Sequence, residues 1–161
     1  GVVIQVGKNV QKFKVGDEIY ARPRDHRTGT FAEKIALHEA DAAFKPKNIS
    51  MAEAASLPLV GLTAWQALVE VGKIQAGQKV FIQAGSGGVG TFAIQLAKYL
   101  GATVATTASA KNTDLVKKLG ADIVIDYQTH DFEQILKNYD LVSVSRRTAF
   151  ANSSHVLFSS A

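Results

Sequence analysis

Apolar and polar residues follow two different periods along most of the chain. From residue 58 onward, short apolar runs alternate with segments whose apolar residues recur at helical spacing. The runs predict strands near 79–84, 102–107, 122–126 and 140–144, and the spaced segments predict helices near 61–71, 88–100, 111–119 and 131–137. Strands that alternate with helices in this way indicate an α/β fold with a parallel sheet and right-handed crossovers.

The residues before 58 have a different pattern. Glycine and proline separate short extended segments, which predict strands near 2–6, 18–22 and 30–37. A short helix is expected over 51–56, because Ser50 is a suitable N-cap and Glu53 follows three residues later, as in a capping box. We therefore expect two structural parts, with the change near Pro58.

A glycine-rich segment joins the predicted strand 79–84 to the predicted helix 88–100. Its residues are Gly85, Ser86, Gly87, Gly88, Val89 and Gly90. In a dinucleotide site the first glycine permits the sharp turn, the second brings the backbone close to phosphate, and the third lets the helix pack on its strand. Unpaired N–H groups at the helix start favour an anion, so the segment predicts a pyrophosphate site. The alternative is a tight turn without a ligand.

The next strand indicates which dinucleotide would bind. An NAD site places Asp or Glu about 20 residues after the first glycine, against the ribose 2′-hydroxyl. No acid stands there; Thr106, Thr107, Ser109 and Lys111 offer hydroxyls and a cation instead, which suit a 2′-phosphate. This predicts NADP(H) as the cofactor. Alternatively, Ser109 caps the helix 111–119 and Lys111 is a solvated side chain.

Composition restricts the remaining classes of function. The chain has no cysteine, and its four histidines, His26, His38, His130 and His155, are scattered, so no zinc site of an alcohol dehydrogenase is expected. The net charge of +4 comes from dispersed lysines, which predicts no nucleic-acid partner. We found no uninterrupted apolar stretch of membrane length and no signal sequence, and we expect a cytoplasmic protein without a membrane partner.

Five motifs, in order along the chain, resemble the medium-chain dehydrogenase/reductase superfamily, and within it the zinc-free quinone oxidoreductase and enone reductase branch. The motifs are residues 15–21 (VGDEIYA), 29–33 (GTFAE), 54–68 (AASLPLVGLTAWQAL), the glycine-rich segment, and 119–127 (LGADIVIDY). The resemblance implies that 1–57 is part of a GroES-like substrate domain and 58–142 part of a Rossmann NADP-binding domain. Residues 143–161 do not match and are expected to form a divergent tail.

The resemblance also implies which residues contact the cofactor. The glycine-rich loop maps to residues 84–90, the contacts to the 2′-phosphate map to Ser109, Lys111 and Tyr127, and Thr63 corresponds to a threonine near the nicotinamide. Many relatives carry the cation one position later, where this chain has Asn112. For Thr63 a bond within its own helix turn, and for Tyr127 a packing role at a strand end, remain open alternatives.

The chemistry implied by the resemblance is zinc-independent hydride transfer from NADPH to a quinone, or to the β-carbon of an enone or enal. No catalytic residue is assigned; Tyr20 is a candidate proton donor or substrate wall, although an aromatic residue in a strand usually serves packing. With 161 residues, the chain is expected to be a fragment with impaired activity, and a homodimer is one expected form. The alternative function is a non-catalytic nucleotide-binding or partner-binding domain.

Overall fold

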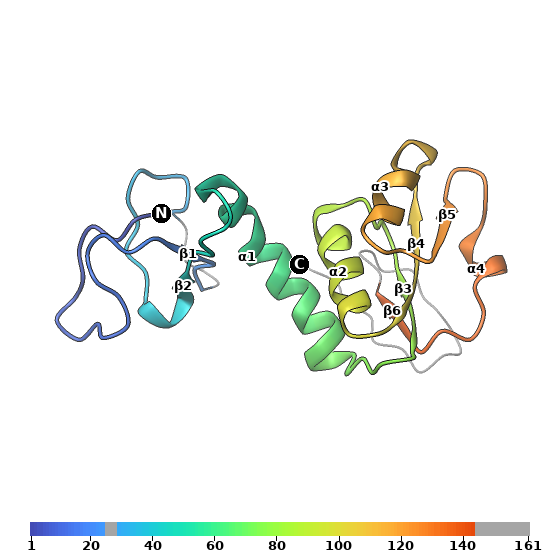
Figure 1. The fold of residues 1–161 in the computed structure, drawn as a ribbon, viewed down its shortest axis with the longest axis horizontal. Helices are drawn as coiled ribbons and strands as arrows, with labels where there is room; N and C mark the ends of the chain where they lie inside the picture. Colours follow the sequence, from blue (N-terminus) through green and yellow to red (C-terminus); the bar gives the residue numbers. More distant parts are fainter. Residues whose placement is uncertain (25–28, 144–161) are drawn as a thin grey trace. The chain divides into compact units, whose positions relative to one another are not determined.

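The computed structural model describes residues 1–24 and 29–143, so the predicted tail lies outside the described residues except for Ser143. Two compact units divide between Leu59 and Val60. We call residues 1–59 unit 1 and the part that begins at Val60 unit 2, and describe each by itself. Figure 1 shows the helices and strands of both.

Unit 2 contains a four-stranded sheet. Its strands are β3 (Lys79–Ile82), β4 (Thr103–Ala108), β5 (Ile123–Asp126) and β6 (Leu141–Ser143). They are all parallel and lie in the order β5-β4-β3-β6, with Val80 opposite both Val104 and Leu141. The predicted α/β fold is confirmed. Because β3 has its successor β4 on one side and β6 on the other, the strand order reverses at β3, which is where such sheets bind ligands.

Helical segments cover both faces of this sheet. They are α2 (Gly88–Tyr99), the 3₁₀ turn η3 (Ala110–Asn112), α3 (Thr113–Lys118) and α4 (Phe132–Ile135). Val80 and Ile82 point to one face and share a buried core with Ile94 of α2. Phe81 points to the other face, where its ring stacks on Phe132 of α4 at 4.9 Å between centroids. β3 is therefore buried on both sides, as expected for a central parallel strand.

Asp122, at the start of β5, is bonded to both β4 and α2. Its carboxylate accepts a hydrogen bond from the Val104 N–H at 2.7 Å and pairs with the Lys98 ammonium at 2.9 Å. Burial alone would raise the pKa of Asp122, but the bonds from Val104 and Lys98 outweigh it and lower this pKa below its ordinary value. The charged form therefore stabilises the junction of α2, β4 and β5.

Helix α1 (Met51–Trp65) runs without a break past Pro58 and continues as a π-helical segment, η2 (Gln66–Val71). The prediction of separate helices over 51–56 and 61–71 is wrong at this boundary. Proline removes one backbone donor and normally interrupts a helix. Here Ala54, Ala64 and Leu68 are fully buried, so packing on both sides of Pro58 maintains the helix.

The stretch Met51–Val71 is also long and apolar enough to cross a membrane by length and composition, with a mean hydropathy of 1.3. Core helices of soluble proteins pass the same test, so this is weak evidence. The absence of a membrane partner stays a prediction.

Unit 1 has little regular structure among its described residues. β1 (Ile19–Ala21) pairs antiparallel with β2 (Ala42–Phe44), which follows the 3₁₀ turn η1 (Glu39–Asp41). The strand expected over 18–22 is confirmed in its centre, whereas β2 was not predicted. The strands expected over 2–6 and 30–37 are wrong: a single bridge joins Val2 to Glu18, and 30–37 has no strand partner among the described residues. An extended segment without a partner has no ladder to stabilise it.

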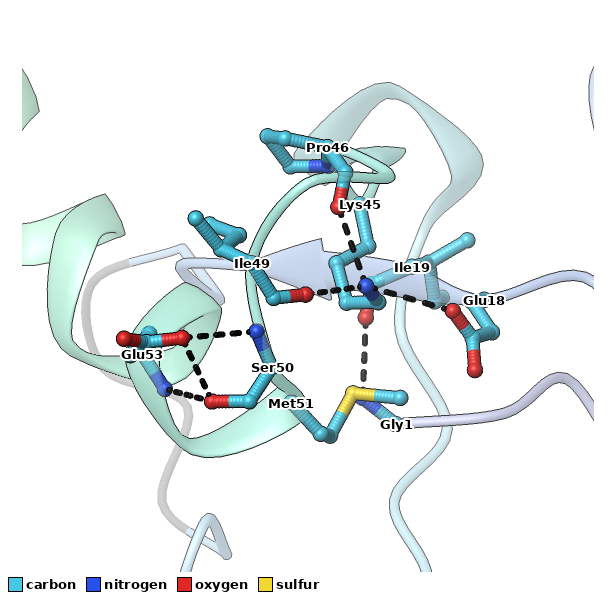
Figure 2. A network of polar contacts seen from close by, with 9 residues as sticks. All are labelled: Gly1, Glu18, Ile19, Lys45, Pro46, Ile49, Ser50, Met51 and Glu53. Carbon is cyan, nitrogen blue, oxygen red and sulfur yellow. Dashed lines mark hydrogen bonds and ion pairs between the residues drawn. The ribbon is translucent and has the colours of Figure 1, made fainter.

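Polar contacts hold the end of unit 1 together where α1 begins (Figure 2). The Lys45 ammonium, whose side chain is 7% exposed, donates to the carbonyls of Pro46 and Ile49 and pairs with Glu18 at 3.3 Å. Next to it, Ser50 and Glu53 exchange backbone-to-side-chain bonds of 2.7 and 3.2 Å. The predicted capping box is confirmed.

Candidate functional site

The glycine-rich loop leaves β3 between its two neighbouring strands. The Gln83 N–H donates to the Ser143 carbonyl of β6 at 2.9 Å, whereas the Gly85 N–H donates to the Thr107 carbonyl of β4 at 2.9 Å. The Gly87 N–H closes the turn by donating to the Ala84 carbonyl. The loop therefore lies at the carboxyl ends of the strands, where the strand order reverses.

The main function of Gly85 and Gly90 is to let the backbone lie close to neighbouring groups. Neither glycine is needed for a left-handed torsion angle. The left-handed residue of the turn is Ala84, with φ of 57°, and not Gly85 as the sequence suggested. A Cβ on Gly85 would overlap the Thr106 hydroxyl and lie 2.9 Å from Ile94 Cδ1. A Cβ on Gly90 would overlap the Ala84 carbonyl and lie 2.7 Å from the Gly85 Cα. Gly85 thus brings the loop against β4, and Gly90 brings α2 against the loop.

The two threonines of β4 differ from their predicted use. Thr106 is fully buried and donates its hydroxyl proton to the Ile82 carbonyl at 2.6 Å. The Thr107 hydroxyl, also buried, accepts a bond from the Ala84 N–H at 2.9 Å. The expectation that the Thr106 hydroxyl faces a 2′-phosphate is wrong, because its proton is bonded to β3 inside the sheet. For Thr107, which accepts a bond and is 2% exposed, the expectation stays a prediction. Their function in this structure is to hold the loop.

The start of α2 is suited to an anion. Gly87 is the N-cap in extended conformation, and it makes no side-chain bond to the first helical N–H groups. These groups and the helix dipole favour a phosphate by about 0.3–1 kcal/mol for the dipole alone. Gly87, Gly88 and Val89 are exposed, and a Cβ on Gly87 would lie 3.2 Å from the Ala84 carbonyl. Because these three residues are exposed, a ligand can reach the backbone at the start of α2.

The residues predicted to contact the 2′-phosphate follow the carboxyl ends of β4 and β5. Ser109 is 8% exposed and precedes η3 without capping it through its side chain, so the alternative capping role is not observed. Lys111 is exposed in η3, and Tyr127 follows β5 with 58% of its surface exposed. The ends of neighbouring parallel strands meet at one edge of a sheet, which is the same edge that carries the loop.

Thr63 belongs to the part of α1 that packs on α2. Val60 lies against Gly88, and Gly61 lies against the Phe92 ring; a Cβ on either glycine would meet these neighbours at 3.3 Å. Thr63 is half-buried two residues after Gly61. The structure therefore places its helix beside the start of α2.

One contact at the loop was missed by the sequence analysis. The Asn112 side-chain amide donates to the Ser86 hydroxyl at 3.2 Å and joins the end of η3 to the glycine-rich loop. The available signal was that the resemblance noted in the sequence analysis implies a cation at the position of Asn112.

Two further observations concern substrate and metal. In unit 1, Tyr20 of β1 lines a cavity of about 540 Å³ together with Ile19, Ile35 and Met51. Among the described residues, no three histidine, aspartate or glutamate side chains gather as metal ligands; His26 and His155 lie outside those residues.

Comparison with known proteins gives matches over nearly the whole chain. A family described as "Zinc-binding dehydrogenase" matches residues 88–145. The chain is 43% identical over 142 residues to the human NAD(P)H oxidoreductase RTN4IP1, mitochondrial, covering 86% of this chain and 36% of that protein. It is 43% identical over 150 residues to the Arabidopsis thaliana NADPH-dependent alkenal/one oxidoreductase, chloroplastic, covering 88% and 39%.

Solved structures agree with these sequence matches. The quinone oxidoreductase from Coxiella burnetii superposes with a TM-score of 0.84 at 38% identity, covering 90% of this chain and 46% of that one. The chain thus spans less than half the length of each of these three proteins.

Proposed function

We propose that this chain, which belongs to the medium-chain dehydrogenase/reductase superfamily, binds NADPH at the glycine-rich loop. Quinone and enone oxidoreductases are among its relatives, and we propose that the chain takes part in the reduction of quinones or α,β-unsaturated carbonyls. The observation that carries the proposal is the loop itself. Gly85 and Gly90 allow a turn too close for side chains, and the uncapped start of α2 lies beside it.

The proposed contacts divide between the two ends of the cofactor. Gly85, Ser86, Gly87, Gly88, Val89 and Gly90 surround the diphosphate; Ser109, Lys111 and Tyr127 hold the ribose 2′-phosphate, and Thr63 lies toward the nicotinamide. The absence of Asp or Glu at the end of β4 supports NADPH over NADH, since an acid there would repel the phosphate.

NADPH would supply a hydride to the quinone ring or to the β-carbon of an enone or enal. The chain's own residues would bind and orient the cofactor, and Tyr20 would form part of the substrate wall, as its position at a cavity of unit 1 supports. We further propose that the reaction needs no zinc, because the chain has no cysteine to supply thiolate ligands.

We also propose that unit 1 corresponds to part of a GroES-like substrate domain over 1–57 and unit 2 to part of a Rossmann domain over 58–142, with a divergent tail after it. A cytoplasmic location stays a prediction, since two relatives carry mitochondrial and chloroplastic names. The proposed partners are a small quinone, enone or enal and a second copy of the chain, with neither nucleic acid nor membrane.

The test is titration of the full chain with NADPH and with NADH, followed by cofactor fluorescence. We expect tighter binding of NADPH, and Lys111→Ala should weaken NADPH about threefold to tenfold while leaving NADH unchanged, because only NADPH carries the 2′-phosphate. Lys117→Ala, an exposed lysine on α3, is the matched control.

Failure of the unaltered chain to bind either nucleotide would refute the proposal. Binding without reduction of a quinone or an enone would favour the alternative, a nucleotide-binding domain that does not turn over.

A further inference from the structure

Asn112 lies at the junction between η3 and α3, one residue after Lys111. It is half-buried, and its side-chain amide donates to the hydroxyl of Ser86, which is also half-buried. The bond of 3.2 Å is within the range of an N–H to oxygen hydrogen bond. It connects two segments that are separated by 26 positions in the chain.

The orientation of Asn112 is not explained by helix capping. Asn112 is the N-cap residue of α3, where asparagine commonly accepts bonds from the first helical N–H groups. It makes no such bond, and its amide turns to the glycine-rich loop. A helix that forgoes its side-chain cap is less stable, so the contact with Ser86 replaces a stabilising interaction.

The direction of the bond determines what Ser86 can do. A serine hydroxyl has one proton to donate and two lone pairs to accept. Because its oxygen accepts from Asn112, the proton remains for another acceptor, and within the described part of the chain Ser86 donates it to no protein group. Ser86 stands between Gly85 and Gly87, at the start of the turn that leads to α2. A phosphate oxygen at the helix start is an acceptor of the required kind.

We propose that Asn112 is a positioning residue for the dinucleotide: by donating to Ser86, it turns the Ser86 hydroxyl proton toward the diphosphate and fixes the loop against η3. This inference rests on the proposed function. Two neighbouring residues would then have different roles. Lys111 would bind the 2′-phosphate of NADPH, whereas Asn112, through Ser86, would affect binding of the diphosphate that NADPH and NADH share.

The experiment measures dissociation constants of NADPH and NADH for the full chain, for Asn112→Ala, for Ser86→Ala and for the double variant, with Lys117→Ala as control. Asn112→Ala and Ser86→Ala should each weaken both nucleotides by about threefold to tenfold, the usual effect of one neutral hydrogen bond. The factor should be equal for NADPH and NADH. The double variant should bind as Ser86→Ala does, because Asn112 acts only through Ser86.

Several results would overturn the inference while leaving the proposed function intact. These are unchanged binding in Asn112→Ala, a loss confined to NADPH, or a double variant whose loss is the product of the two single losses. If the unaltered chain binds neither nucleotide, the proposed function fails, and the inference fails with it. Thermal unfolding of each variant without nucleotide confirms that it is folded. If Asn112→Ala is unfolded, Asn112→Leu takes its place, because leucine has a similar volume and cannot donate to Ser86.

Discussion

Unit 2 and unit 1 differ in where their strands find partners. β3 pairs on both sides, with β4 and with β6, and its side chains are buried on both faces. In unit 1, β1 and β2 pair over three residues, and large apolar side chains such as Ile4 and Val15 are about 60% exposed. A strand is therefore stable where it pairs with neighbouring strands and packs against helices, whatever its own propensity.

The sharpest test of this contrast changes one glycine in each unit to valine. Gly85→Val should destabilise unit 2 by about 3 kcal/mol, because the new Cβ overlaps the Thr106 hydroxyl in a packed interior. Gly7→Val in unit 1 is the control, since its Cβ would meet only Val10 Cγ2 at 3.9 Å. Chemical unfolding measures both; equal effects would contradict the contrast.

A second change asks whether unit 1 depends on its polar contacts instead. Lys45→Ala removes a buried ammonium and leaves the carbonyls of Pro46 and Ile49 without their partner, so we expect a loss of about 2 kcal/mol. Hydrogen exchange at β1 and β2 reports the change locally. Lys47→Ala, an exposed lysine in the same loop, should have almost no effect, and a similar loss there would refute the role of Lys45.

The smallest effect is expected from acid at Asp122. Its pKa is lowered in the folded chain, so its contribution is present above the pKa of the unfolded chain, which is about 3.9 for a free aspartate, and is lost as the pH falls through the lower folded value. The melting temperature of unit 2 should therefore fall as the pH is lowered below about 4, and that of the Asp122→Asn variant should fall less. Because Asp122 is partly exposed, the shift should be a few degrees at most, and an equal fall in both proteins would argue against it.

Most helices and strands of unit 2 could be predicted from the sequence, because the apolar spacing within each segment is sufficient to identify it. Strand β3, the glycine-rich loop and helix α2 are consecutive in the chain, so apolar spacing and glycine positions were sufficient to find them. The inward bonds of Thr106 and Thr107 were not predictable, since they depend on the register between β3 and β4.

The errors elsewhere have similar physical causes. The strand expected over 30–37 has suitable residues but no partner among the described residues, and propensity alone cannot reveal this. Separate helices were expected over 51–56 and 61–71, whereas α1 continues past Pro58 with Ala54 and Ala64 buried on either side. The contact between Asn112 and Ser86 joins segments 26 positions apart, which no local pattern indicates.

The backbone amides of Gln83, Ala84 and Gly85 are divided between two strands: the first bonds to β6, and the next two bond to Thr107 of β4. The start of the loop is thereby held by hydrogen bonds to the strands on both sides of β3. Any change in sheet twist that alters the spacing of β4 and β6 would change the shape of the glycine-rich loop. The affinity of the loop for an anion would therefore depend on the geometry of the whole sheet. Distant substitutions in either strand could then tune affinity without touching the ligand.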